Sequence, residues 1–181
     1  MTTKLVTAPV GLPVPLAAAI AQAKADGAGM DAEIELKVRG IAGEVENKIK
    51  RALIEQTRRV TLDHFPDAIK LIRPPLIAVE YVKYIDADGV QRTLAPQDYL
   101  VDSVSEPGYV MPAPGCAWPA TADRANAVEV QYRCGYGADH TAVPPPIQTY
   151  ILGCIEAMYA STPSRNEQFL CGLLNGFKVL V

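Results

Sequence analysis

The stretch from Tyr132 to Cys154 gathers the residue types that a nucleophilic enzyme would use. It contains two cysteines, Cys134 and Cys154, and an adjacent acid and base, Asp139 and His140. A cysteine nucleophile needs a histidine within hydrogen-bonding reach and a third group that orients the imidazole. The same stretch also has the features of a strand that turns into a helix, so the two interpretations have to be compared.

The spacing of these residues favours the structural interpretation. Cys134 follows Val128, Val130 and Tyr132 at a period of two, which puts its thiol on the apolar face of a strand, where a small buried residue fits. Asp139 is a poor orienting group for His140, because side chains adjacent in sequence tend to point apart. We therefore predict no catalytic residues, and keep a cysteine-dependent hydrolase or transferase as the alternative.

The sequence contains no complete motif for binding a metal or a nucleotide either. The four cysteines have no CxxC pair, and Asp63, His64 and Asp67 have no further ligand at a recognised spacing. The segment IDADG lacks the later ligands of a calcium loop, and Asp88-Gly89 predicts a hairpin turn there instead. The nucleotide-binding, zinc-protease and hydrolase signatures do not occur, so we predict no metal and no cofactor.

The composition is that of a globular protein. The chain has 181 residues, of which 49% are hydrophobic and 20% are charged, and its net charge is −3. This charge does not favour binding to nucleic acid through counterion release. The sequence has no apolar run of eighteen residues, and prolines interrupt its N-terminal segment, so we expect neither a membrane span nor a signal peptide. We expect a protein that is cytoplasmic at synthesis, with reduced cysteines.

The sequence predicts helices towards both ends of the chain. Helix formers follow Pro15, and a stripe of apolar residues at steps of three and four then predicts a long second helix. The stripe consists of Met30, Ile34, Val38, Ile41, Val45, Ile49 and Leu53. Gly40 and Gly43 interrupt it, either because another backbone comes close or as plain weak points of the helix. Prolines 144–146 start a third helix with an apolar face.

Between the helices the period changes to the alternation of strands. TRRVTLDHF, IKLIRPPL, VEYVKYID, DYLVDS, GYVMP and AVEVQYRCGYG each predict a strand. The fold class is therefore α+β, with helical N-terminal and C-terminal segments packed together and a β-rich hairpin and meander insertion between them. We expect a single domain, with a helical part at 16–56, the insertion at 57–137, the C-terminal helix at 144–161 and a tail at 162–181.

The order of these segments resembles the head–tail connector (adaptor) proteins of long-tailed bacteriophages and prophages. The resemblance rests on RALIEQTRRVTLDHFP, the RPPL segment, the DADG hairpin, the DY strand, the tryptophan loop and GYG followed by a proline-started helix. It covers most of the chain. The sequence departs from the family pattern before the second helix, where the acidic start is reduced to GMDAEIE, and after Thr162.

The resemblance implies a structural protein without catalytic residues, located in the neck of the virion after assembly in the bacterial cytoplasm. Such proteins form a ring beneath the portal, extend the DNA channel and present a surface to the next neck or tail-completion protein. About twelve copies of this chain would follow from portal symmetry. DNA would pass through the channel without sequence-specific binding, and no membrane would be involved.

A ring needs two different contact faces on each subunit, and the second helix and the tail offer candidates. The candidate interface residues are Arg39, Glu46, Lys50, Leu173, Leu174, Phe177 and Val179. Two interpretations of the tail LLNGFKVLV remain open, because it can complete its own core or dock on a neighbouring subunit.

Two other functions remain as alternatives. The first is the cysteine-dependent enzyme, with Cys134 or Cys154 acting with His140. The second is a DNA-binding accessory factor of the same phage, which would use Lys48, Lys50 and Arg51. Glu46 and Glu55 lie among these cations, so a salt-bridged and solvated helix face is the favoured interpretation of the cluster.

Overall fold

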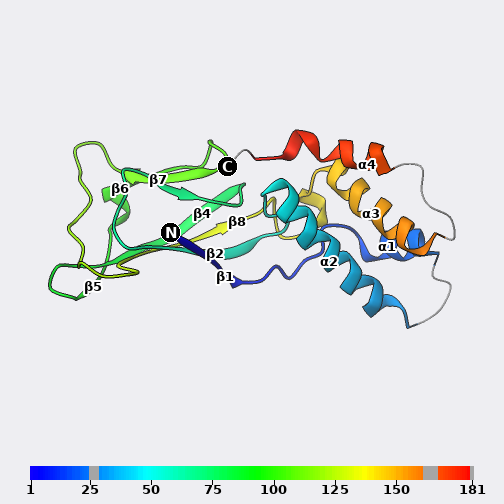
Figure 1. Cartoon of the computed structure of the whole chain (residues 1–181), viewed down its shortest axis with the longest axis horizontal. Coiled ribbons are helices and arrows are strands. Elements are labelled where there is room, and N and C mark those ends of the chain that lie inside the picture. The colour runs from blue at the N-terminus through cyan, green and yellow to red at the C-terminus, as the bar shows by residue number, and fades with distance from the viewer. Residues whose placement is uncertain (25–28, 161–166, 180–181) are drawn as a thin grey trace. The chain divides into compact units, whose positions relative to one another are not determined.

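The chain folds as an α+β protein with four α-helices and two antiparallel sheets among the residues that the structure describes. This structure is a computed structural model that describes residues 1–24, 29–160 and 167–179 (Figure 1). The helices are α1 Leu16–Ala23, α2 Asp31–Ile49, α3 Pro145–Tyr159 and α4 Glu167–Leu173. The strands are β1 Thr2–Thr7, β2 Gln56–Leu62, β3 Ile69–Leu71, β4 Leu76–Ile85, β5 Gln91–Thr93, β6 Tyr99–Asp102, β7 Gly108–Pro112 and β8 Val128–Cys134. The predicted α+β class is confirmed.

The chain divides into two compact units. The β unit comprises Met1–Ala8 and Gln56–Gly135, and the helical unit comprises Pro9–Glu55 and Tyr136–Val181. Thr2–Thr7 pair with β2 as strand β1, a pairing that the sequence alone did not predict.

The core of the helical unit is built from the apolar stripe of α2. Ile34, Val38, Ile41, Val45 and Ile49 are all buried, as the sequence predicts. They pack with residues of α1 and α3, and the fully buried part of this core includes Ala19, Ile147, Ile151 and Ile155. Burying each large aliphatic side chain contributes about 1.5–3 kcal/mol.

Helix α2 ends earlier than its apolar pattern predicts. The pattern continues to Leu53, but Lys50 takes a left-handed conformation with φ of 62° and stops the helix after Ile49. Leu53 is nevertheless only 1% exposed. The apolar pattern therefore predicts correctly that Leu53 is buried, but not that it is helical. Periodicity cannot separate the two, because a chain leaving a helix can bury its next apolar residue in the same core.

Sheet A of the β unit has five strands in the order β1-β2-β8-β4-β5. Its centre is β8, where buried and half-buried residues alternate along the whole strand. Val128, Val130, Tyr132 and Cys134 point to the buried side, as predicted for Cys134. Tyr132 is fully buried, and its hydroxyl donates to the Ile72 carbonyl at 2.8 Å, so burying the phenol leaves no polar group unpaired.

Sheet B has three strands in the order β3-β7-β6. Ile69, Leu71 and Val110 supply its buried residues. The predicted DADG hairpin joins β4 to β5, and Gly89 alone in it has a positive φ, of 80°. The tryptophan loop is fixed by Trp118, which stacks on Phe65 at 4.6 Å between ring centroids and donates from its indole nitrogen to the Pro66 carbonyl.

Candidate functional site

The residues that suggested cysteine chemistry do not form a catalytic arrangement. Cys134 is completely buried in β8, and its Sγ lies 3.8 Å from the Gln56 carbonyl oxygen of the neighbouring strand. A nucleophile has to contact its substrate, and a thiol that is completely buried in a sheet is not positioned to do so. Cys134 acts as a small core residue of the β unit.

Asp139 and His140 belong to the turn that leads into α3. The Asp139 carboxylate accepts hydrogen bonds from the Thr141 backbone N–H at 2.8 Å and the Thr141 hydroxyl at 2.6 Å. These bonds hold the pKa of the carboxyl below its usual value. The His140 carbonyl accepts from the Gln148 side chain. Asp139 therefore caps a short helical turn instead of orienting an imidazole.

Cys154 lies half-buried on α3 beside Tyr150. Burial raises the pKa of its thiol, so the thiolate that would act as nucleophile is disfavoured. Lys48 of α2 points at the same tyrosine, with its Nζ 3.4 Å from the Tyr150 hydroxyl. The cation thus joins α2 to α3 through a tyrosine, and its charge offsets only part of the effect of burial on the pKa of Cys154.

No group of three or more histidine, cysteine or acidic residues with metal-binding geometry occurs within the described ranges. Asp63 and His64 line a surface cavity of about 380 Å³, together with residues 121–125. The Asp63 carboxylate accepts from the Asn126 backbone N–H at 2.8 Å, so its contact fixes the tryptophan loop. Among residues 1–24, 29–160 and 167–179, no helix is both long and apolar enough to span a membrane.

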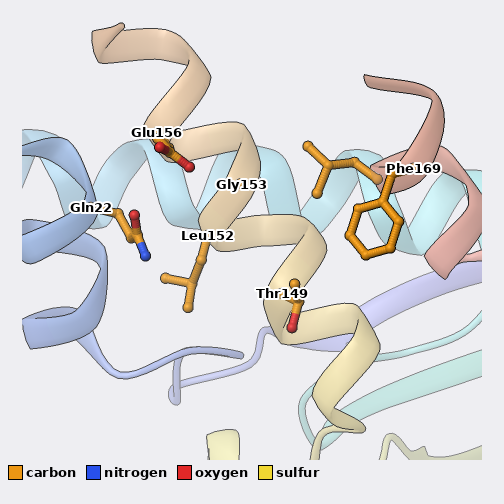
Figure 2. A pocket seen from close by; sticks show the side chains of 7 residues that line it. Gln22, Thr149, Leu152, Gly153, Glu156 and Phe169 are labelled. Carbon is orange, nitrogen blue, oxygen red and sulfur yellow. The ribbon is translucent and has the colours of Figure 1, made fainter. Parts of the chain in front are cut away.

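A groove of about 330 Å³ lies between α1, α3 and α4 (Figure 2). Gln22 reaches into it from α1, Leu152 and Glu156 from α3, and Phe169 from α4. Gly153 allows this approach, because a Cβ there would lie 2.7 Å from a methyl carbon of Leu170. The polar side chains lining the groove are those of Gln22, Thr149 and Glu156, and the Thr149 hydroxyl donates to the Pro145 carbonyl of its own helix at 3.0 Å.

The candidate interface residues of α2 have partners inside the chain. Arg39 forms an ion pair with Glu35 at 2.8 Å and also donates to the Val10 carbonyl. Glu46 accepts from the Leu53 backbone N–H at 2.8 Å and so stabilises the segment that follows the helix. Lys50 is exposed at the left-handed end of α2. Arg39 and Lys50 are thus available at the surface, while Glu46 mainly has a local role.

The described part of the tail packs against its own helical unit. Leu174 is completely buried in the helical core, and Leu173 and Phe177 pack against that core half-buried. The Val179 N–H donates to the Ile49 carbonyl at 3.0 Å, which satisfies a carbonyl at the end of α2. Leu174 therefore completes the core and has no surface that a partner could contact.

The basic cluster at the end of α2 is divided among different contacts. Arg51 is 9% exposed and its Nε donates to the Phe177 carbonyl at 2.7 Å. Lys48 lies against Tyr150, as described above. Only Lys50 of the three cations proposed for DNA binding is left with its side chain exposed and no such contact described. Of these three cations, Arg51 is therefore buried, whereas Lys48 and Lys50 are exposed.

Sheet A carries an ordered polar network on the face opposite its buried side. Arg59 of β2, Gln131 of β8 and Tyr81 of β4 face each other across neighbouring strands. Arg59 Nη2 donates to Gln131 Oε1 at 3.0 Å, and the Tyr81 hydroxyl donates to Glu129 at 2.5 Å. Burial, and then the hydrogen bond to Glu129, raise the pKa of Tyr81 to about 12.

Two edges of the β unit carry exposed apolar side chains. On β1, the edge of sheet A, Leu5 and Val6 are exposed. On β6, the edge of sheet B, Leu100 is 48% and Val101 40% exposed, and Val104 in the following loop is 91% exposed. The sequence alone did not predict that these residues are exposed, because alternation does not distinguish an edge strand from a central one.

Comparison with solved structures shows the fold that this chain shares. A chain in the neck of an empty gene transfer agent (GTA) particle, computed with C6 symmetry, matches with a TM-score of 0.82 and 21% identity, over 100% of this chain and 97% of that chain. A chain of the virion of the native GTA particle matches with a TM-score of 0.81 and 20% identity over the same shares. A chain in the neck of the native particle, computed with C12 symmetry, gives 0.70 and 21%, again over 100% and 97%.

Two further comparisons gave no match. No protein-family model matches the chain, and no curated protein does.

Proposed function

We propose that this chain is a structural subunit of the neck of a tailed bacteriophage or phage-like particle. Its copies assemble as a ring that joins the portal of the filled head to the tail and extends the DNA channel. The observation that carries the proposal is the match of its whole length to neck chains, with a TM-score of 0.82. The order of sequence segments independently supports the same family of connector proteins.

The partners follow from this position. The chain binds other copies of itself, about twelve if it follows portal symmetry, with the portal protein on one side and a neck or tail-completion protein on the other. The likeness of the fold to a neck chain computed with C12 symmetry supports a ring. In this role the helical segments at 16–56 and 144–161 form one connector domain with the β insertion at 57–137, and DNA passes through without specific contacts.

Fewer surface residues are available for ring contacts than the sequence suggested. Arg39 of α2 and Lys50, which directly follows α2, remain candidates. The exposed parts of the half-buried residues Leu173, Phe177 and Val179 remain candidates as well. The buried Cys134 and the capping role of Asp139 give no support to the enzyme alternative. The protein works by shape and contact.

Deleting the gene from the phage or prophage that encodes the chain tests this function. The expected result is that DNA-filled heads and complete tails accumulate separately and that infectious or transducing particles fall to background. Supplying the chain from a plasmid should restore joined particles. Tailed, infectious particles made without the chain would contradict the proposal.

A further inference from the structure

The β unit has four strand edges, which differ in their side chains. Edges β3 and β5 have three residues each. Ile69 and Leu71 of β3 are buried, and β5 carries Arg92 in an ion pair with Asp86 at 2.8 Å. Short edges that carry charge or are covered resist pairing with another chain. These two edges are therefore closed to additional strands.

Edges β1 and β6 are longer, with six and four residues, and each combines exposed apolar side chains with one charged residue, Lys4 or Asp102. Five of the six residues of β1 are exposed, and Leu100 and Val101 of β6 are exposed apolar residues without a proline or lysine in the strand. An open strand edge presents unpaired backbone N–H and C=O groups that a strand of another chain can bind. Both edges therefore have the backbone geometry and the apolar side chains of a pairing surface.

The two edges carry opposite charges. Lys4 lies on β1 and is paired in register with Arg59 of β2, while Arg58 is paired with Leu5. Beside β6, residues 94–112 contain Asp98, Asp102 and Glu106 and neither lysine nor arginine. Glu129 neutralises part of this positive charge, because it lies 3.4 Å from Arg59. Lys4 and Arg58 still leave the β1 edge positive and complementary to the β6 edge.

We propose that β1 of one copy pairs with β6 of the next copy, so that each β unit joins its neighbours through two different edges. This inference rests on the proposed ring and names the contact that closes it. A heterologous contact of this kind uses two different surfaces on each subunit, as a ring requires. Figure 1 draws β1 and β6 at different sides of the β unit, which leaves both edges free for separate neighbours.

Cysteine cross-linking tests the pairing directly. The probe is a chain with Leu5→Cys and Val101→Cys, in which the exposed Cys116 and Cys171 are replaced by serine. Oxidation of the assembled protein by copper phenanthroline should give a ladder of covalent multimers on a non-reducing gel. A chain with only one of the two introduced cysteines should give no covalent multimers. Dimers from Leu5→Cys alone would show β1 pairing with β1 and would overturn the inference.

A charge exchange gives a second test that does not depend on cysteines. Lys4→Glu and Asp98→Lys should each raise the concentration needed for assembly by about tenfold, and the double variant should restore it. Asp98 is preferred to Asp102, because Asp102 accepts hydrogen bonds from the Val104 and Ser105 backbones. Equal assembly of all three variants would contradict the pairing.

Two lysine variants complete the design. Val101→Lys should block pairing at the β6 edge, whereas Val90→Lys, at an equally exposed apolar residue of the β4–β5 hairpin, should assemble normally. Rings that form in electron micrographs without β1–β6 cross-links would overturn this inference and leave the proposed neck function standing. A chain that forms no assembly, alone or on portal protein, would overturn both.

Discussion

The helical unit and the β unit use their apolar residues differently. In the helical unit, sixteen buried residues from α1, α2, α3 and the segments around them form one continuous core. Its tail also turns inward, with Leu174 fully buried. In the β unit, apolar residues fill one side of sheet A, the other side carries a polar network, and the edge residues Leu100 and Val101 stay exposed.

This difference indicates which surfaces of the chain can most readily form contacts with other chains. A unit that already buries its apolar stripe has little left to gain from a partner, whereas open edges gain backbone hydrogen bonds and apolar burial together. The sequence pointed to the second helix and the tail as ring surfaces. The structure shifts the emphasis to β1 and β6, and leaves to the helical unit mainly exposed residues such as Arg39 and Lys50.

The largest effect expected on stability comes from the helical core. Ile151→Ala removes a completely buried side chain of α3 and should lower the free energy of unfolding by about 2–5 kcal/mol. Urea unfolding followed by circular dichroism measures this loss. Met158→Ala, at an exposed position of the same helix, is the control and should change stability by less than about 0.5 kcal/mol. Equal losses in both would show that the described core is wrong.

A smaller loss should follow from releasing the tail. Val179→Pro removes the N–H that donates to the Ile49 carbonyl and should cost about 1–3 kcal/mol. Val179→Ala keeps that hydrogen bond and isolates the side-chain contribution. Hydrogen exchange at the end of α2 should rise in the proline variant alone. If the alanine variant loses as much stability and protection, the backbone bond is not what holds the tail.

For one glycine of the helical unit, we expect a substitution to raise the stability instead of lowering it. A Cβ at Gly43, exposed in α2, meets no atom within 4 Å, so Gly43→Ala should stabilise the unit by about 1 kcal/mol. A Cβ at Gly11 would collide with the Ala138 carbonyl oxygen, so Gly11→Ala should destabilise it. Thermal unfolding of both variants checks the contrast. Destabilisation by Gly43→Ala would mean that another backbone lies against α2 in the free protein.

The polar face of sheet A should be visible as a shifted tyrosine titration. The pKa of Tyr81 lies at about 12, because burial and the Glu129 carboxylate favour the neutral phenol. A folded pKa above the unfolded one gives stability that is complete below about pH 10 and is lost as the pH rises towards 12. Subtracting the absorbance titration of Tyr81→Phe from that of the wild type isolates this group.

Glu129→Gln supplies the control for that titration. The variant removes the negative charge beside the phenol and should move the pKa of Tyr81 part of the way back towards 10, since burial remains. An unchanged titration would mean that Tyr81 and Glu129 are not hydrogen-bonded in solution.

Local pattern predicted much of the fold but not its edges. The stripe of α2, the alternation of β8 and the DADG hairpin were all read correctly, because each depends on residues close in sequence. The pairing of Thr2–Thr7 with β2 was missed, since strand order depends on contacts distant in sequence. For the same reason, the sequence could not tell that Leu174 is buried while Leu100 is exposed.

The burial of Cys134 could be predicted from the sequence, whereas the surface used for contacts between chains could not. The period of two that places Cys134 with Val128, Val130 and Tyr132 was sufficient to put its thiol inside the sheet. An interface has no such signature in one sequence, because an apolar residue of an edge strand and one of a central strand follow the same alternation. Only the order of strands in the sheet distinguishes them.

The central claim, a ring in the neck, is tested most directly by electron microscopy of the purified chain, alone over a range of concentrations and mixed with the portal protein of the same particle. The account predicts closed rings with a central opening, in solution or seated on the portal, and their loss in the Val101→Lys chain but not in Val90→Lys. Monomers that form no ring in either sample, and leave the portal bare, would contradict it.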